Sequence, residues 1–183
     1  TLTGDIPGNF KIFYKQGRFI NNTIDWSMET ERVNASETSP SVHANIAVDN
    51  IDNVHVVWSE VGLIGNLDVF YRSRSKDGKW SEGIENISSS PDISLLPSIT
   101  IARSNDIYVS WSETQMSTFG MFIASDIYYK HYVAGLGWFV FPPVINITSA
   151  STDSLNIFQN VRVNAQGSFD IVWNNQEGLF TDT

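Results

Sequence analysis

The six tryptophans of this 183-residue chain occupy two positions of an internal repeat. One set closes an apolar run each time: Trp58, Trp111 and Trp173. The other set follows a second kind of run, such as KIFYK, DVFYR or DIYYK: Trp26, Trp80 and Trp138. In the first set, 53 residues separate Trp58 from Trp111, and 62 separate Trp111 from Trp173. A period of this size with several strand-like runs per unit is typical of propellers and related arrays.

The composition favours an all-β module that is secreted or displayed at the cell surface. Aromatic residues make up 13% of the chain and charged residues only 17%, a balance suited to half-buried strands. The formal net charge of −9 argues against binding nucleic acid through its phosphates or binding an anionic membrane surface. The absence of cysteine excludes disulfides and thiolate metal sites.

A three-residue hairpin loop recurs between the first two strands of each repeat. The loops comprise residues 50–52, 103–105 and 165–167, and they end on Asp52, Asn105 and Gly167. These residue types tolerate the left-handed backbone conformation that such a hairpin requires there. The resulting register predicts three cross-strand pairs: Ala47 with His55, Thr100 with Tyr108 and Arg162 with Asp170.

Two further strands complete each predicted unit. The chain then reads as one segment, 1–183, that starts with a half unit of third and fourth strands at 10–36. Complete units follow at 45–88 and 98–148, and a half unit of first and second strands lies at 160–176. A four-stranded antiparallel sheet cannot bury both faces alone, so neighbouring units are expected to stack on each other.

The turn between the third and fourth strands carries Ser75-Lys76-Asp77-Gly78-Lys79-Trp80. With the strand runs around it, this segment resembles the Asp box of sialidase-like (BNR/Asp-box repeat) β-propellers, which has the pattern Ser-x-Asp-x-Gly-x-x-Trp. The match is two residues short, and the next unit keeps only Gly135, Gly137 and Trp138. The resemblance implies an all-β fold: three blades' worth of four-stranded antiparallel sheets, part of a six-bladed ring.

Structural roles are expected for the Asp-box residues and for every tryptophan. Asp77 should accept backbone N–H groups and hold its turn, together with Ser75 and Gly78. Tryptophans that recur at fixed positions are expected to pack between blades rather than to bind sugar: Trp26, Trp58, Trp80, Trp111, Trp138 and Trp173.

Three blades are too few to close a ring. The missing blades would come either from a second copy of the chain or from further propeller blades, and the sequence leaves both open. The apolar residues between the second and third strands of the second complete unit are expected to contact that partner or a neighbouring blade: Met116, Phe119, Met121 and Phe122.

Five charged residues are candidates for ligand binding. Arg162 either pairs with Asp170 across the hairpin or points into a central channel to bind an anion. The other four are carboxylates that flank equivalent loops in both complete units: Glu60, Asp68, Glu113 and Asp126. Such pairs could act as acid and base or hold Ca²⁺, although their recurrence favours loop architecture. No other metal or cofactor is expected.

Two functions follow from the resemblance. The first is a binding or architectural module that recognises glycan or protein through its blade loops. The alternative is a sialidase-like glycoside hydrolase or a fragment of one. Sialidases bind a carboxylate with three arginines, whereas the arginines here do not form a convergent set, and the Phe-Arg-Ile-Pro motif is missing. No catalytic residue is therefore predicted. Four Asn-x-Ser/Thr sequons occur, at Asn21, Asn34, Asn86 and Asn146, and the last three are expected at equivalent ends of the fourth strands.

Overall fold

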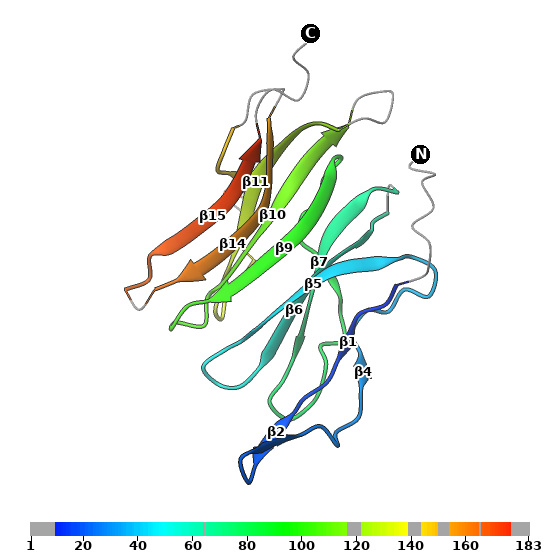
Figure 1. The fold of residues 1–183 in the computed structure, drawn as a ribbon, viewed down its shortest axis with the longest axis vertical. Helices are drawn as coiled ribbons and strands as arrows, with labels where there is room; N and C mark the ends of the chain where they lie inside the picture. Colours follow the sequence, from blue (N-terminus) through cyan, green and yellow to red (C-terminus); the bar gives the residue numbers. More distant parts are fainter. Residues whose placement is uncertain are drawn as a thin grey trace.

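The computed structural model describes residues 10–63, 65–116, 122–138, 144–149, 154–164 and 166–176. Within these ranges every regular element is a β-strand, which confirms the all-β prediction. The strands form side-by-side antiparallel sheets, with β15 at one side of the array and β1 and β4 at the other (Figure 1). The described residues include no helix long and apolar enough to cross a membrane.

The first complete sheet has four antiparallel strands in sequential order. These are β5 (Ser41–Val48), β6 (Val54–Val61), β7 (Leu67–Arg74) and β8 (Glu85–Asn86). The central strand β6 is buried along most of its length and β7 at every position is buried or half-buried, because both strands have neighbours on their two edges and faces.

The second sheet repeats this order and continues into two more strands. It contains β9 (Ile93–Ile101), β10 (Ile107–Met116), β11 (Phe122–Val133), β12 (Gly137–Trp138) and β13 (Ile145–Asn146). The hairpin of β14 (Leu155–Val163) and β15 (Phe169–Gln176) joins β11 through a single parallel pair, Ser125 with Leu155. This one bridge merges seven strands into one hydrogen-bonded sheet.

The N-terminal segment contributes two short pairs of strands. β1 (Phe13–Tyr14) pairs with β4 (Glu31–Arg32), and between them β2 (Arg18–Ile20) and β3 (Thr23–Asp25) form a hairpin. Asn21 and Asn22 turn this hairpin with φ of 50° and 63°, the left-handed conformation that a two-residue hairpin loop needs.

The predicted hairpin register is confirmed in all three repeats. Ala47 faces His55, Thr100 faces Tyr108 and Arg162 faces Asp170. The third loop residues Asp52, Asn105 and Gly167 have φ of 67°, 67° and 86°. Local stereochemistry alone therefore determined this part of the fold.

Each first strand begins earlier than predicted, because a bulge interrupts it. The predicted starts were residues 45, 98 and 160, whereas the strands start at Ser41, Ile93 and Leu155. The bulges contain three side-chain-bearing residues with φ of 55°: His43, Leu96 and Phe158. Leucine and phenylalanine rarely adopt this conformation, so the sequence carried no signal of the bulge.

The tryptophans do not all lie in the core. Trp58 and Trp111 are fully buried, and Trp80 and Trp138 are half-buried. Trp173 is 37% exposed and Trp26 is 53% exposed, so these two are not packed between sheets within the described part of the chain. Both lie in the half units at the two sides of the array, where no other sheet formed by the described residues covers them.

Candidate functional site

Two of the predicted carboxylates bind the indole that precedes them by two residues. Trp58 donates its Nε1–H to Glu60 Oε2 across 3.0 Å, and Trp111 donates to Glu113 Oε2 across 2.6 Å. A serine of the neighbouring first strand donates to each of the same oxygens, Ser41 to Glu60 and Ser94 to Glu113. The glutamates are buried, so these bonds satisfy the Oε2 atom of each, whereas Glu113 Oε1 is buried with no hydrogen-bond partner among the described residues.

The other two carboxylates fasten the fourth strand to the third. Asp68 accepts from Asn86 Nδ2 at 2.7 Å and from the Ser88 hydroxyl at 3.1 Å. In the same way, Asp126 accepts from Asn146 Nδ2 at 2.8 Å and from the Thr148 hydroxyl at 2.6 Å. The sequons are therefore part of the strand clamp in both complete units.

These four carboxylates lie opposite each other in pairs, Glu60 with Asp68 and Glu113 with Asp126. Each already accepts protein hydrogen bonds, so the arrangement suits a structural clamp better than Ca²⁺, which takes six to eight oxygen ligands. Among the residues that the structure describes, no group of three or more His, Cys, Asp or Glu side chains could hold a metal ion.

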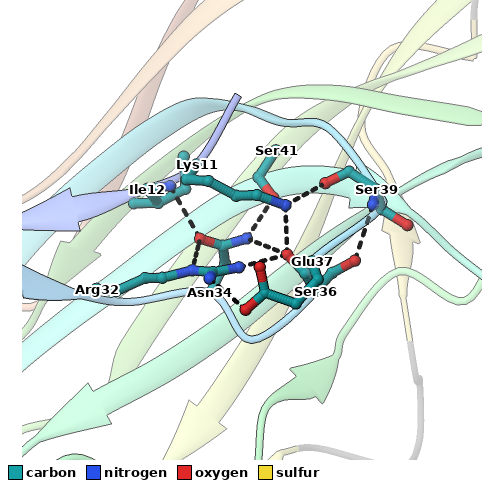
Figure 2. Close-up of polar contacts among 8 residues, drawn as sticks. All are labelled: Lys11, Ile12, Arg32, Asn34, Ser36, Glu37, Ser39 and Ser41. Carbon is teal, nitrogen blue, oxygen red and sulfur yellow. Dashed lines mark hydrogen bonds and ion pairs between the residues drawn. The ribbon is translucent and has the colours of Figure 1, made fainter. Parts of the chain in front are cut away.

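The N-terminal half unit replaces this clamp with a basic one (Figure 2). Lys11 donates to the Ser36 carbonyl at 2.5 Å, where the complete units have Asp68 and Asp126. Arg32 pairs with Glu37 at 2.5 Å. Sequence reasoning missed this network because Lys11 and Arg32 replace the residue types on which the repeat was aligned.

Asn34 is not equivalent to Asn86 and Asn146, contrary to the prediction from the sequons. Its Oδ1 accepts from the Ile12 N–H at 3.0 Å, the role that the Ser88 and Thr148 hydroxyls have toward the third strands of the complete units. It is almost fully buried, and its Nδ2 donates to Ser41 at 3.0 Å (Figure 2). The alignment was therefore shifted by two residues.

Arg162 is exposed on β14. Although it faces Asp170 in the register, the salt bridges found among the described residues do not include this pair. Its guanidinium donates instead to the neighbouring Val161 carbonyl at 2.6 Å.

The apolar residues expected to contact a partner fall mostly outside the described part of the chain. Phe119 and Met121 lie outside it, and the side chain of Phe122 does too. Met116 is half-buried and lies opposite Phe122 in the ladder.

The Asp-box turn is closed by Ser75 and not by Asp77. The Ser75 hydroxyl accepts from the Lys79 N–H at 3.2 Å, and the Gly78 N–H donates to the Ser75 carbonyl at 2.9 Å. Asp77 is exposed, and the hydrogen bonds found in the described residues do not include its side chain. Because the box is two residues short, Ser75 stands in the position from which a side chain can reach back into the turn.

A cleft of about 440 Å³ lies between the two complete sheets, at the end that carries this turn. Its wall includes Asp49, His55, Tyr71, Arg74, Lys79 and Trp80. The β6 and β7 strands present His55 and Tyr71 from adjacent positions, and the hairpin loop after β5 presents Asp49. The sequence predicted a structural role for Trp80 but did not indicate that these side chains line one cleft, because strands and loops separated in the chain bring them together.

Three of these side chains form a hydrogen-bonded chain. His55 Nδ1 lies 2.7 Å from the Tyr71 hydroxyl, and His55 Nε2 lies 3.4 Å from Asp49 Oδ2. Since the carboxylate can only accept, Nε2 carries the proton and Nδ1 accepts from Tyr71. Burial lowers the pKa of His55, while the hydrogen bond and charge of Asp49 oppose that shift. Burial also raises the pKa of Tyr71, so both rings are neutral at pH 7.

The arginine of the cleft, Arg74, and the nearby Arg72 are committed to the neighbouring half unit. Arg74 donates to Glu31 through two nitrogens, at 3.1 and 2.6 Å, and Trp80 Nε1 donates to the same carboxylate at 2.7 Å. Arg72 donates to the Val33 carbonyl at 2.7 Å and stacks over Trp80. The cleft wall is thus polar and aromatic, with Asp49 and Lys79 among its charged side chains, and its arginine, Arg74, is already paired with Glu31.

Comparison with known proteins agrees with this architecture. No family model and no curated protein sequence matches the chain. Among solved structures it is similar to the Hadza microbial sialidase Hz136, with a TM-score of 0.54 and 14% identity. The match covers 75% of this chain and 32% of the sialidase, so the chain spans about a third of that protein's length. At this identity the likeness shows the fold alone, and that fold is a sialidase-like, all-β one.

Proposed function

We propose that this chain supplies consecutive blades of an Asp-box (BNR) β-propeller. The support is a contact that recurs between neighbouring units. Trp80 meets Tyr14 edge to face with ring centroids 5.7 Å apart, and Trp138 meets Tyr71 in the same way at 5.1 Å. Identical packing at successive interfaces is what stacking of repeated blades requires. A six-bladed ring, as first expected, would repeat this contact around its whole circumference.

We further propose that the module binds a ligand and does not hydrolyse one. The observation that carries this is the use of Glu60, Asp68, Glu113 and Asp126 as internal hydrogen-bond acceptors, which suits a structural role better than that of a catalytic acid or base. The cleft between the complete sheets is the proposed binding site. Its neutral His55–Tyr71 pair and its Trp80 ring suit the hydroxyls and apolar faces of a glycan.

Screening the folded chain against a glycan array, followed by calorimetry, tests this proposal. Lys79 lies on the cleft wall and is exposed, so Lys79→Ala is expected to weaken glycan affinity about fivefold without changing thermal stability. Lys76→Ala on the same turn is the matched control, because Lys76 does not line this cleft. Failure of the folded chain to bind any glycan would overturn the proposal and favour recognition of protein.

Location outside the cell, secreted or on the surface, is part of the same proposal, since glycans concentrate there and the composition suits such a module. A sialidase-like hydrolase is the alternative, favoured only by the likeness to a sialidase structure. Turnover of a fluorogenic sialoside by the purified chain would replace the binding proposal with this one.

A further inference from the structure

The two half units of this chain have complementary exposed surfaces. Equivalent positions are set by hydrogen bonds: the N–H groups of Val33, Ile87 and Ile147 each donate to a third-strand carbonyl, at 2.9, 2.8 and 2.8 Å. When the units are aligned by these hydrogen bonds and by the tryptophan repeat, β1 corresponds to β7 and β11, and β15 corresponds to β6 and β10. A comparison of each half unit with the complete units then shows which contacts it lacks.

The β15 strand lacks the strand that covers its equivalents. Val57 and Trp58 on β6 are fully buried, as are Ser110 and Trp111 on β10. At the same positions Val172 is 66% exposed and Trp173 is 37% exposed. The sheet order places β14 on one edge of β15 and no described strand on the other. Among the described strands, this edge of β15 is therefore open.

The β1 strand lacks the matching neighbour. It pairs with β4 on one edge, and no described strand pairs with the other. In the complete units, Phe70 stacks on Trp58 at 6.2 Å and Tyr128 stacks on Trp111 at 6.4 Å. Phe13 is their equivalent on β1 and is 62% exposed. Trp173 thus lacks an aromatic partner on a third strand, and Phe13 lacks a tryptophan partner on a second strand.

A hydrogen bond from a basic side chain to a backbone carbonyl recurs between neighbouring units. Arg72 donates to the carbonyl of Val33 in the preceding unit, at 2.7 Å, and Lys130 donates to that of Ile87 at 2.9 Å. The next carbonyl in this series belongs to Ile147, which is only half-buried. The equivalent basic residue is Lys15, exposed on the segment just after β1.

The edge-to-face contacts lack one further member. Trp80 packs on Tyr14 of the preceding unit, and Trp138 packs on Tyr71. The next tyrosine in the series is Tyr129, which is less buried than the other two. The remaining tryptophan of this set is Trp26, one of the most exposed aromatic side chains described.

We propose that β15 of one copy pairs antiparallel with β1 of a second copy, completing a split four-stranded sheet. The register of the complete units places Phe13 of the second copy opposite Trp173, and its Gln16 opposite Asp170. Lys15 of the second copy then reaches the Ile147 carbonyl, and its Trp26 packs on Tyr129. Each copy offers one β15 edge and one β1 edge, so two copies related by a twofold axis satisfy both at once.

The residues that would meet in the split sheet also differ together from the complete units. There, Glu60 faces Asp68 and Glu113 faces Asp126. The same positions of the split sheet hold Asn175 and Lys11. Trp173 and Asn175 donate to Asn156 at 3.0 and 2.9 Å, in place of the buried glutamate. In the split sheet, Asn175 therefore replaces the glutamate and Lys11 replaces the aspartate. No two like charges would face each other between the two copies.

The test uses the fact that the chain has no cysteine. A Gln16→Cys/Asp170→Cys double variant is expected to oxidise to a covalent dimer, since these exposed positions lie opposite each other in the proposed pairing. The Gln16→Cys/Ile171→Cys variant is the matched control. It shifts one residue to the other face of the strand and is expected to remain uncrosslinked under the same conditions.

Sedimentation of the unmodified chain completes the test. A particle of twice 20.5 kDa is expected. The Phe13→Ala and Trp173→Ala variants should raise the dissociation constant of this dimer at least about tenfold, or about 1.4 kcal/mol. The control Leu136→Ala should leave it unchanged. A folded 20.5 kDa monomer at all concentrations, equal cross-linking of both cysteine pairs, or a ladder of larger species would overturn the two-copy closure. The proposal rests on sheet packing alone, so loss of glycan binding would not affect it.

Discussion

The indole N–H of Trp111 lies 2.6 Å from Glu113 Oε2, and the Ser94 hydroxyl donates to the same oxygen at 2.8 Å. This buried arrangement recurs at Trp58 and Glu60. A motif that looked like a candidate acid on a loop is therefore an anchor between the first and second strands of each unit.

Two substitutions of Glu113 distinguish what its hydrogen bonds contribute to stability from what its charge contributes. Glu113→Ala is expected to lower the free energy of unfolding by about 1–3 kcal/mol, because it leaves the Trp111 and Ser94 donors unmatched. Glu113→Gln keeps an acceptor oxygen, so the expected loss is smaller. Urea unfolding measures both. Equal losses for the two variants would show that the charge matters more than the hydrogen bonds.

The same residue predicts a pH dependence. Burial raises the pKa of Glu113 above its ordinary value, against the hydrogen bonds from its neighbours. The folded chain therefore holds this proton more tightly than the unfolded chain does, and stability is lost as the pH rises from about 4.5 through the folded-state pKa. Glu113→Gln should remove that loss. Unfolding free energies at pH 4.5 and 7 measure the slope, and an unchanged slope in Glu113→Gln would contradict it.

For His55, the expected pH dependence of stability has the opposite sign and lies at higher pH. Its folded-state pKa is lowered, chiefly by burial, so the unfolded chain binds the proton more readily below about 6.5. Stability from this source is present above that pH and is lost as the pH falls through the lowered pKa. His55→Gln should reduce the slope without abolishing it, since His43 and His131 have lowered pKa values too. A variant with the parent's slope would argue against a buried, neutral His55.

The shortened Asp-box turn allows a direct comparison of two neighbours. Ser75→Ala removes the acceptor of the Lys79 N–H and is expected to cost about 0.5–1.5 kcal/mol. Asp77→Ala changes an exposed side chain and should stay within about 0.5 kcal/mol of the parent. Thermal unfolding of the two variants tests this. A larger loss of stability for Asp77→Ala would show that Asp77 holds the turn, as the sequence predicts.

Expression in a host that glycosylates Asn-x-Ser/Thr is expected to modify Asn21 rather than the other sequons in the folded, secreted protein. Asn21 is exposed in the β2–β3 loop. Asn34 is buried, and the Nδ2 groups of Asn86 and Asn146 donate to Asp68 and Asp126. Peptide mass mapping, with Asn21→Gln as the control, distinguishes the sites. A glycan on Asn34 of the folded protein would be incompatible with the clamp described.

Sequence patterns determined those features that depend on near neighbours in the chain. The hairpin register around Asp52, Asn105 and Gly167 followed from loop length and from the few residue types that accept a positive φ. The division into units followed from the tryptophan repeat. Both signals are local, because backbone stereochemistry and strand alternation act over a few residues.

Only the tertiary structure decided which polar groups meet. The bulges at His43, Leu96 and Phe158 have no sequence signal, since their strain is balanced by packing of the whole sheet. Burial of Glu113 turned a possible ligand group into an internal acceptor, and exposure of Trp173 turned an expected core residue into a candidate contact. A residue type specifies which bonds a side chain can make, but desolvation and the neighbouring strands, brought together from distant parts of the chain, determine which of them form.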